Sequence, residues 1–131
     1  PMLGDEEPNA GFCSESVKPW LPLAKNFREI NVAKQSSDPD SRLNFYRRVI
    51  RLRNTTPALN EGQMEIANDI CNKKVLAYYR TFGNKRLAIL LNMSGSAVKN
   101  PVGHNEIAIS KHHGAETRRL QPFEGRVVRL Q

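Results

Sequence analysis

The chain has 131 residues and a formal net charge of +7, with 39% apolar and 25% charged residues. This length allows one domain, or a small domain with an additional element, and the composition is that of an ordinary globular protein. The longest apolar run, at residues 87–91, is far shorter than the ~20 residues of a membrane span, so no membrane partner is expected. The basic charge is concentrated in residues 41–131, with sixteen bases against six acids.

Residues 1–37 are predicted to be mostly irregular, because prolines and turn-forming residues interrupt any regular pattern. Large apolar side chains are nevertheless spread through the segment, namely Met2, Leu3, Phe12, Trp20, Leu21, Leu23, Phe27, Ile30 and Val32. A solvated linker would not carry so many apolar groups. We therefore expect this segment to pack against another surface.

Residues 38–54 are predicted to form an amphipathic helix. Asp38 is a suitable N-cap, and Pro39 fits the first helical position, where no backbone donor is needed. One face carries Leu43, Tyr46, Val49, Ile50 and Arg53, widened by Phe45 and Leu52, and the other side carries Arg42, Arg47, Arg48 and Arg51. Residues 55–57 are expected to end the helix.

From residue 62 onward the apolar pattern changes to a period of two, which is typical of strands. Strands are predicted near residues 64–68 and at 75–82, 86–93, 106–110, 117–120 and 125–130, with a hairpin turn at 82–85. Short strands at this spacing predict an antiparallel β-sandwich. The expected fold is thus mainly β with one long helix.

The two cysteines, Cys13 and Cys71, do not form a C-x-x-C pair, so neither a zinc site nor a redox motif is expected. A disulfide between them is possible, and two buried free thiols are the favoured alternative. The sequence predicts no cofactor, and it leaves the compartment unknown.

Several short blocks along the chain match one enzyme family in their amino-acid sequence and in their order. They are Pro1-Met2-Leu3-Gly4-Asp5 with Pro8-Asn9-Ala10-Gly11-Phe12, Lys18-Pro19-Trp20-Leu21-Pro22, Ile30-Asn31-Val32 with Gln35 and Asp38-Pro39, Ser41-Arg42-Leu43-Asn44-Phe45-Tyr46-Arg47 with Pro57-Ala58-Leu59, and Phe123-Glu124 with Arg126-Val127-Val128. These blocks resemble the α-glucosidase and oligo-1,6-glucosidase branch of the α-amylase family, in which the first two stretches read P-M-Q-W-D…N-A-G-F and K-P-W-L-P.

The resemblance implies a (β/α)8 barrel followed by an antiparallel β domain. Residues 1–60 would be the last active-site-side loop and last helix of the barrel, and residues 61–131 the carboxyl-terminal β domain. The apolar groups before residue 61 would then pack on barrel parts that this chain lacks. The chain would be a fragment or truncated relative of an α-glucosidase-type hydrolase.

The family's catalytic carboxyl groups come from motifs that precede the P-M-Q-W-D stretch. No acid of this chain lies in a G-x-R-x-D or N-H-D setting, so we expect the chain to hold no catalytic, substrate-binding or metal-binding residue of its own and to be inactive alone. Gly4 replaces the tryptophan usual in the family and Leu3 the usual glutamine, and both departures weaken the expectation of an active parent enzyme.

Four groups of side chains have both a functional and a plain interpretation, and the plain one is favoured for each. Asp5 could line a sugar site but is expected to be a solvated loop acid, and Trp20 could stack on a sugar ring but is expected to be a packing anchor. His104, His112 and His113 could bind a metal but are expected at the surface. The helix arginines could bind phosphates but are expected to be a solvated face.

Two alternative functions are a stand-alone carbohydrate-binding module and a basic nucleic-acid-binding β module. The second is disfavoured because no aromatic residues are interleaved with the bases. The expected partners are the remainder of a catalytic barrel, or a second copy through the apolar helix face, with an α-glucan or oligosaccharide as a possible ligand.

Overall fold

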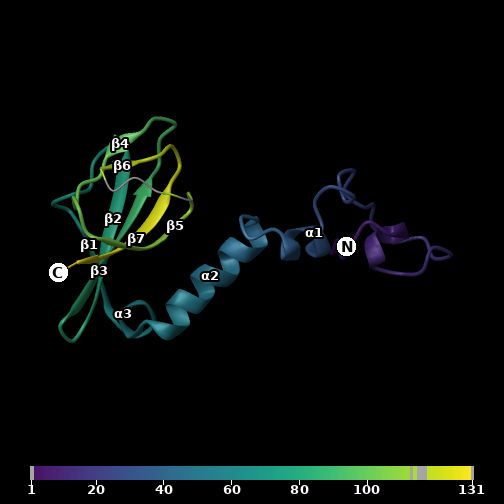
Figure 1. Ribbon diagram of the computed structural model, residues 1–131, viewed down its shortest axis with the longest axis horizontal. Coiled ribbons are helices and arrows are strands. Elements are labelled where there is room, and N and C mark those ends of the chain that lie inside the picture. The colour runs from purple at the N-terminus through teal and green to yellow at the C-terminus, as the bar shows by residue number, and fades with distance from the viewer. Residues whose placement is uncertain (1, 113, 115–117, 131) are drawn as a thin grey trace. The chain divides into compact units, whose positions relative to one another are not determined.

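Figure 1 shows the computed structural model of the chain, which describes residues 2–112, 114 and 118–130. The chain forms two compact units, Pro1–Arg48 and Val49–Gln131. Helix α2 (Arg42–Thr55) contains the residues at which the two units join. The domain boundary expected after residue 60 stays a prediction.

The first unit contains a short 3-10 helix, η1 (Pro8–Gly11), and a helix that the sequence pattern did not predict, α1 (Val32–Ser37). The side chain of Asn31 explains the start of α1. Its Oδ1 accepts a hydrogen bond from the Lys34 N–H at 2.9 Å, and its Nδ2 donates to the Phe27 carbonyl at 2.9 Å. An asparagine cap of this kind is a recognisable start signal.

Helix α2 begins at Arg42, so the predicted start at Asp38 is wrong. Ser41 takes the capping role, because its Oγ accepts from the Asn44 N–H at 3.2 Å. Asp38 instead closes the preceding turn by accepting from the Asp40 N–H at 2.9 Å. The Asn44 side chain fixes this turn by donating to the carbonyls of Gln35 and Asp38.

The second unit consists mainly of antiparallel strands, as predicted (Figure 1). In the described residues, one sheet has the order β1-β2-β3-β7-β5 and a second pairs β4 with β6. The strands are β1 (Gln63–Ile66), β2 (Val75–Phe82), β3 (Lys85–Asn92), β4 (Val98–Lys99), β5 (Glu106–Ser110), β6 (Arg119–Leu120) and β7 (Gly125–Leu130).

The predicted strand positions agree closely with this sheet, apart from two details. The predicted hairpin joins β2 to β3, with Phe82 paired to Lys85 and with Gly83 at a φ of +57°, where glycine is favoured. Strand β4 was not predicted. Of the predicted strand at residues 117–120, the first residue lies outside the described residues.

The core lies between the two sheets. Alternation along β2 places Val75, Ala77 and Tyr79 on one face of the large sheet. They pack with buried residues of β3, β6 and β7, among them Leu90 and Leu120. Tyr79 also donates from its hydroxyl to Asp69 at 3.0 Å, and burial, followed by this bond, raises the pKa of Tyr79 above its usual value.

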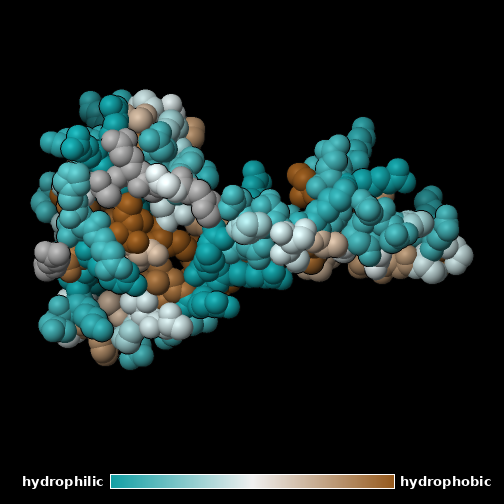
Figure 2. Space-filling view, viewed as in Figure 1, coloured by the Kyte–Doolittle hydropathy of each residue, from teal (hydrophilic) through white to brown (hydrophobic). Residues whose placement is uncertain are grey.

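The opposite face of the large sheet is only partly covered within this unit. A short helix, α3 (Pro57–Asn60), packs there and buries Ala58 against Leu87 and Ile89. Ile66 and Leu76 remain exposed on this face. Apolar side chains are visible at the surface of the strand unit in Figure 2. Helix α3 was not predicted, because Pro57 was interpreted only as the end of the preceding helix.

Cys13 and Cys71 are free thiols, and each is partly exposed. The preference for free thiols over a disulfide is confirmed, whereas the expected burial of both is wrong. Among the described residues, no helix combines the length and the apolar character needed to cross a membrane.

Candidate functional site

The loop at residues 3–11 is closed on itself by a single buried carbonyl. The oxygen of Ala10 accepts from the Gly4 N–H at 2.8 Å and from the Asp5 N–H at 3.3 Å. The carbonyls of Leu3 and Gly4 in turn accept from the N–H groups of Val32 and Ala33, each at 2.9 Å. The loop is therefore fixed to the first turn of α1.

Asp5 forms part of the loop's own structure. Its Oδ1 accepts from the Glu7 N–H at 3.0 Å, and its carboxyl group lies against Gly11. A Cβ added at Gly11 would lie 2.5 Å from Oδ2 of Asp5, and Asn9, Ala10 and Gly11 all have positive φ. This close approach requires glycine. Asp5 is half-buried and structural, so its description as a solvated acid is wrong.

The chain departs from the family pattern at Gly4, where the structure has limited space. A Cβ at this position would lie 3.1 Å from the Ala10 carbonyl oxygen, tighter than ordinary contact. Trp20 is 82% exposed, so the described residues do not use it as the packing anchor that the sequence predicts. Asn9, which the sequence reasoning missed, donates from Nδ2 to the carbonyls of Ser14 and Val17 at 2.8 and 2.9 Å.

Several acids of the chain have a cationic or hydroxyl partner within the protein. The contacts are Glu6 with Lys34 at 2.8 Å, Glu65 with Arg86 at 3.9 Å, Glu106 with Arg129, Glu124 with Arg126 at 2.7 Å, and Asp69 with the Tyr79 hydroxyl. Lys34 lowers the pKa of Glu6, through a hydrogen bond and its charge. Glu116 lies outside the described residues.

The histidines were considered as metal ligands. His104 is exposed, as predicted for a surface residue, and His112 is half-buried with its backbone N–H donating to the Ser110 Oγ at 3.0 Å. His113 lies outside the described residues. Within the part of the chain that the structure describes, no group of three His, Cys, Asp or Glu residues is arranged to hold a metal ion.

The arginines of α2 contact the helix and its preceding turn. Arg47 donates to the Asn44 side chain at 3.1 Å, and Arg48 donates to the Pro39 carbonyl at 2.6 Å and lies over the Phe45 ring. Two apolar side chains of the same helix are largely exposed: Tyr46, whose ring makes an edge contact with that of Phe45, is 65% exposed, and Ile50 is 56% exposed. No residue of α2 is buried in this chain.

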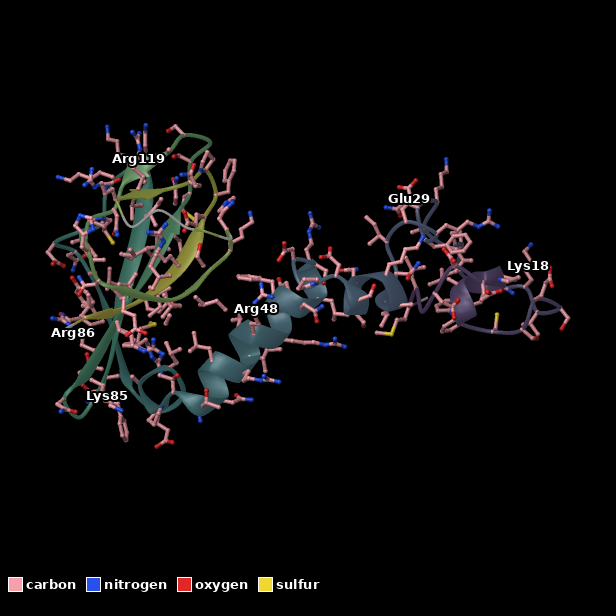
Figure 3. The ribbon with its side chains drawn as sticks, viewed as in Figure 1. Lys18, Glu29, Arg48, Lys85, Arg86 and Arg119 are labelled. Atoms are coloured by element: carbon pink, nitrogen blue, oxygen red, sulfur yellow. The ribbon has the colours of Figure 1, made fainter. Side chains whose placement is uncertain are left out.

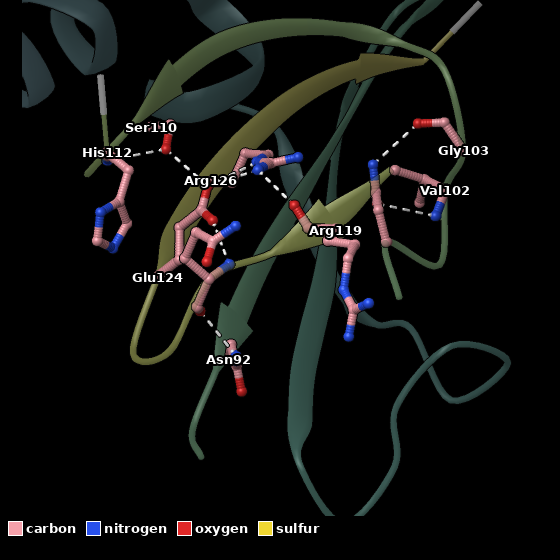
Figure 4. A network of polar contacts seen from close by, with 10 residues as sticks. Asn92, Val102, Gly103, Ser110, His112, Arg119, Glu124 and Arg126 are labelled. Carbon is pink, nitrogen blue, oxygen red and sulfur yellow. Dashed lines mark hydrogen bonds and ion pairs between the residues drawn. The ribbon is translucent and has the colours of Figure 1, made fainter. Parts of the chain in front are cut away.

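Among the residues that the structure describes, the most deeply buried charged groups form an ion pair inside the strand unit, which the sequence pattern did not predict (Figure 4). Glu124 and Arg126 are each only 1% exposed. The Oε1 atom of Glu124 accepts from Arg126 Nε at 2.7 Å and from Ser110 Oγ at 2.6 Å, and Oε2 accepts from the Gln121 N–H at 2.6 Å. Arg126 also donates to the Arg119 carbonyl at 2.9 Å. This network connects β5, β6 and β7.

Comparison with known proteins shows which protein family this chain is similar to. Residues 1–62 match the family model of the α-amylase catalytic domain. The chain belongs to the α-amylase family.

Relatives in the α-amylase family match nearly all of the chain. An oligo-1,6-glucosidase of Saccharomyces cerevisiae is 33% identical over 93% of this chain and 22% of its own length. An oligo-1,6-glucosidase of Parageobacillus thermoglucosidasius is 31% identical over 99% of this chain and 25% of its own length. The solved structure of isomaltulose synthase from Klebsiella sp. LX3 superposes with a TM-score of 0.87 at 31% identity, covering 100% of this chain and 25% of that one. The chain thus spans about a quarter of the length of these α-amylase-family relatives.

Replacing Gly11 by alanine is expected to destabilise the first unit by about 2 kcal/mol, from positive φ and crowding against Asp5. Urea unfolding followed by far-UV circular dichroism measures the cost. The control is the same substitution in an Asp5→Ala background, where the crowding is absent and the loss should be smaller. Equal losses in both backgrounds would contradict the proposed contact.

Proposed function

We propose that this chain is the carboxyl-terminal part of an α-glucosidase-type glycoside hydrolase and serves as its structural end. In this proposal residues 1–60 complete a catalytic barrel and residues 61–131 form an antiparallel β domain. The carboxyl groups that cleave the glycosidic bond belong to protein outside this chain.

The extent of the family match supports the division of roles. The match to the catalytic-domain model ends at residue 62, and β1 begins at Gln63. All of the long strands therefore follow the matched segment. A catalytic segment followed by a β domain is consistent with this order.

The observation that carries the proposal is the unburied apolar face of α2. A helix in a globular protein buries an apolar stripe against a core, yet Tyr46 and Ile50 are exposed and no residue of this helix is buried. Trp20 and Met2 of the first unit are also exposed. These groups are explained if a larger scaffold covers them, so we propose the remainder of the barrel as the partner.

The pairing of the acids supports the assignment of catalysis to another segment. A retaining glycosidase needs two carboxyl groups about 5–5.5 Å apart, one as nucleophile and one as acid/base. Asp5 here supports its loop, Glu124 holds a buried arginine, and Glu6 binds Lys34. Each of these carboxylates has a role in local structure.

The test is hydrolysis of maltose and isomaltose by the purified 131-residue chain, compared with the longer protein that contains it. We expect no glucose release above that of a mock preparation from the same host, because the chain lacks the acid and the nucleophile. Turnover that remains with the chain through successive purification steps would refute the proposal.

The relatives do not favour the alternatives of a carbohydrate-binding or nucleic-acid-binding β module, because the match covers both units of the chain. An oligosaccharide substrate is proposed for the whole protein, by analogy with the oligo-1,6-glucosidases that it resembles.

A further inference from the structure

One end of the strand unit carries a hollow that the proposed function does not use. It has a volume of about 530 Å³ and lies beside the β4–β6 ribbon, lined by Lys99, Asn100, Gly103, His104, Arg118 and Arg119. None of these described lining residues is acidic. We call this feature the β4–β6 hollow. Figure 3 shows Arg119 at this end of the unit, with Lys85 and Arg86 at the opposite, hairpin end.

The register of the ribbon brings its cations together. Lys99 is paired directly with Arg119, and Val98 with Leu120. Leu120 is fully buried, and Val98 packs against the same core. Because side chains alternate along a strand, Lys99 and Arg119 share the outward side of the ribbon, and both are exposed.

A third cation adjoins this pair. The Asn100 N–H donates to the Arg118 carbonyl at 2.9 Å, which continues the pairing beyond Lys99 and Arg119. Like charges directly opposite each other on a two-stranded ribbon repel one another and destabilise the pairing. The chain therefore keeps Lys99 and Arg119 directly opposite each other although their charges repel.

Three other arginines of the same unit have a glutamate as a charge partner, unlike the cations of the hollow. Arg86, Arg126 and Arg129 each lie at ion-pair distance from a glutamate. Among the described residues, no carboxylate lies at such a distance from Lys99, Arg118 or Arg119. Of the fork of donors that Arg119 carries, one nitrogen donates to the Ala97 carbonyl at 3.3 Å.

The wall of the hollow is held in place by the protein itself. Asn100 is buried, its Nδ2 donates to the Gly103 carbonyl at 2.9 Å, and its Oδ1 accepts from the Val102 N–H at 3.2 Å. Figure 4 shows this turn together with the Arg119 side chain, whose guanidinium points away from the buried Arg126. The Arg119 carbonyl is fixed by Arg126, so the backbone that carries the cation is well anchored.

We propose that the β4–β6 hollow binds a phosphoryl group carried by a small organic molecule. Guanidinium forks and an ammonium group match the oxygens of a phosphate, and a dianion would relieve the repulsion between Lys99 and Arg119. The volume lies within the range of small-molecule sites and exceeds the size of a free phosphate ion. Three cations around one hollow, rather than a stripe of bases, favour a small ligand over a nucleic acid. This inference does not depend on the proposed hydrolase role.

The test is titration calorimetry of the chain with glucose 6-phosphate, glucose, inorganic phosphate and a single-stranded oligonucleotide. We expect glucose 6-phosphate to bind with a dissociation constant of about 1 mM or lower, inorganic phosphate to bind more weakly, and glucose to give no heat. The double variant Lys99→Gln/Arg119→Gln should weaken binding of glucose 6-phosphate at least about tenfold. Glucose 6-phosphate should also raise the melting temperature of the parent chain but not of this variant.

The matched control is Lys73→Gln/Lys85→Gln, which removes the same two charges at exposed positions outside the hollow. It should leave the affinity within about twofold of the parent, because salt largely screens the attraction between a ligand and exposed charges that lie more than a Debye length away. Circular dichroism verifies that both variants fold. The single variant Arg118→Gln tests the contribution of the third cation to binding. No heat with glucose 6-phosphate, equal weakening by the two double variants, or binding of the oligonucleotide alone would overturn the proposal.

Discussion

Replacing Glu124 by alanine is expected to lower the free energy of unfolding by about 3–5 kcal/mol, the largest stability effect of any single substitution that we predict. The reason is the charge that remains. Arg126 is 1% exposed, and its guanidinium relies on Glu124 for two of its short contacts. Without the carboxylate, a buried positive charge has no counter-charge, and the Ser110 hydroxyl and the Gln121 N–H lose their acceptor.

Urea unfolding followed by far-UV circular dichroism measures this loss. The matched control is Glu106→Ala. Glu106, on β5, forms an ion pair with Arg129, which lies on β7 as Arg126 does, and both members of this pair are exposed. An exposed pair contributes about 0–1 kcal/mol, so the control should unfold near the parent midpoint.

A second variant separates the charge from the packing. Glu124→Leu/Arg126→Met removes both members of the ion pair and leaves no buried charge, so it should be markedly more stable than Glu124→Ala. If Glu124→Ala and Glu106→Ala lowered stability equally, the buried pair would not have the role assigned here.

The strands of the second unit could be predicted because their signals are local. Residues 75–82 are rich in β-branched and aromatic side chains and residues 125–130 contain Val127, Val128 and Leu130, and the structure places β2 and β7 at those residues. The turn between β2 and β3 was equally clear, because Gly83 supplies the positive φ that the hairpin needs. Each of these features requires only neighbouring residues.

The elements that were missed depend on partners distant in sequence or on single caps. Strand β4 has two residues, and only its pairing with β6 defines it. Helix α2 begins at Arg42, because Ser41 caps it and the Asn44 side chain binds the preceding turn, whereas Asp38 by itself was a plausible cap. The ion pair of Glu124 and Arg126 was hidden for a similar reason, since both residues are charged and charged residues are rarely buried.

The family blocks were visible in the sequence, but the physical roles within them were not. Gly11 and Asp5 belong to the same quoted stretch, yet only the structure places the carboxyl group of one against the backbone of the other. Conversely, the exposure of Trp20 could not be inferred from its apolar surroundings, because its covering surface is not part of this chain in our proposal.

The exposed face of α2 leads to the prediction with the largest functional effect. Replacing Tyr46 and Ile50 together by lysine is expected to weaken association of this chain with the rest of the enzyme at least about 100-fold. Burying a large apolar side chain contributes about 1.5–3 kcal/mol, and the double variant loses two such contributions. Both residues lie on one side of the helix, four positions apart, so one surface would receive both.

The measurement is binding of the purified chain to the separately produced remainder of the protein, with recovery of maltose or isomaltose hydrolysis as a second readout. The isolated variant should keep the parent stability, because Tyr46 is 65% exposed and Ile50 is 56% exposed before any partner binds. Arg51→Glu is the control, since it changes the charge by the same amount, in the opposite direction, at an exposed position of α2. If the double variant bound as well as the parent, the face of α2 would not be the surface that joins this chain to a barrel, and the division of roles proposed here would be wrong.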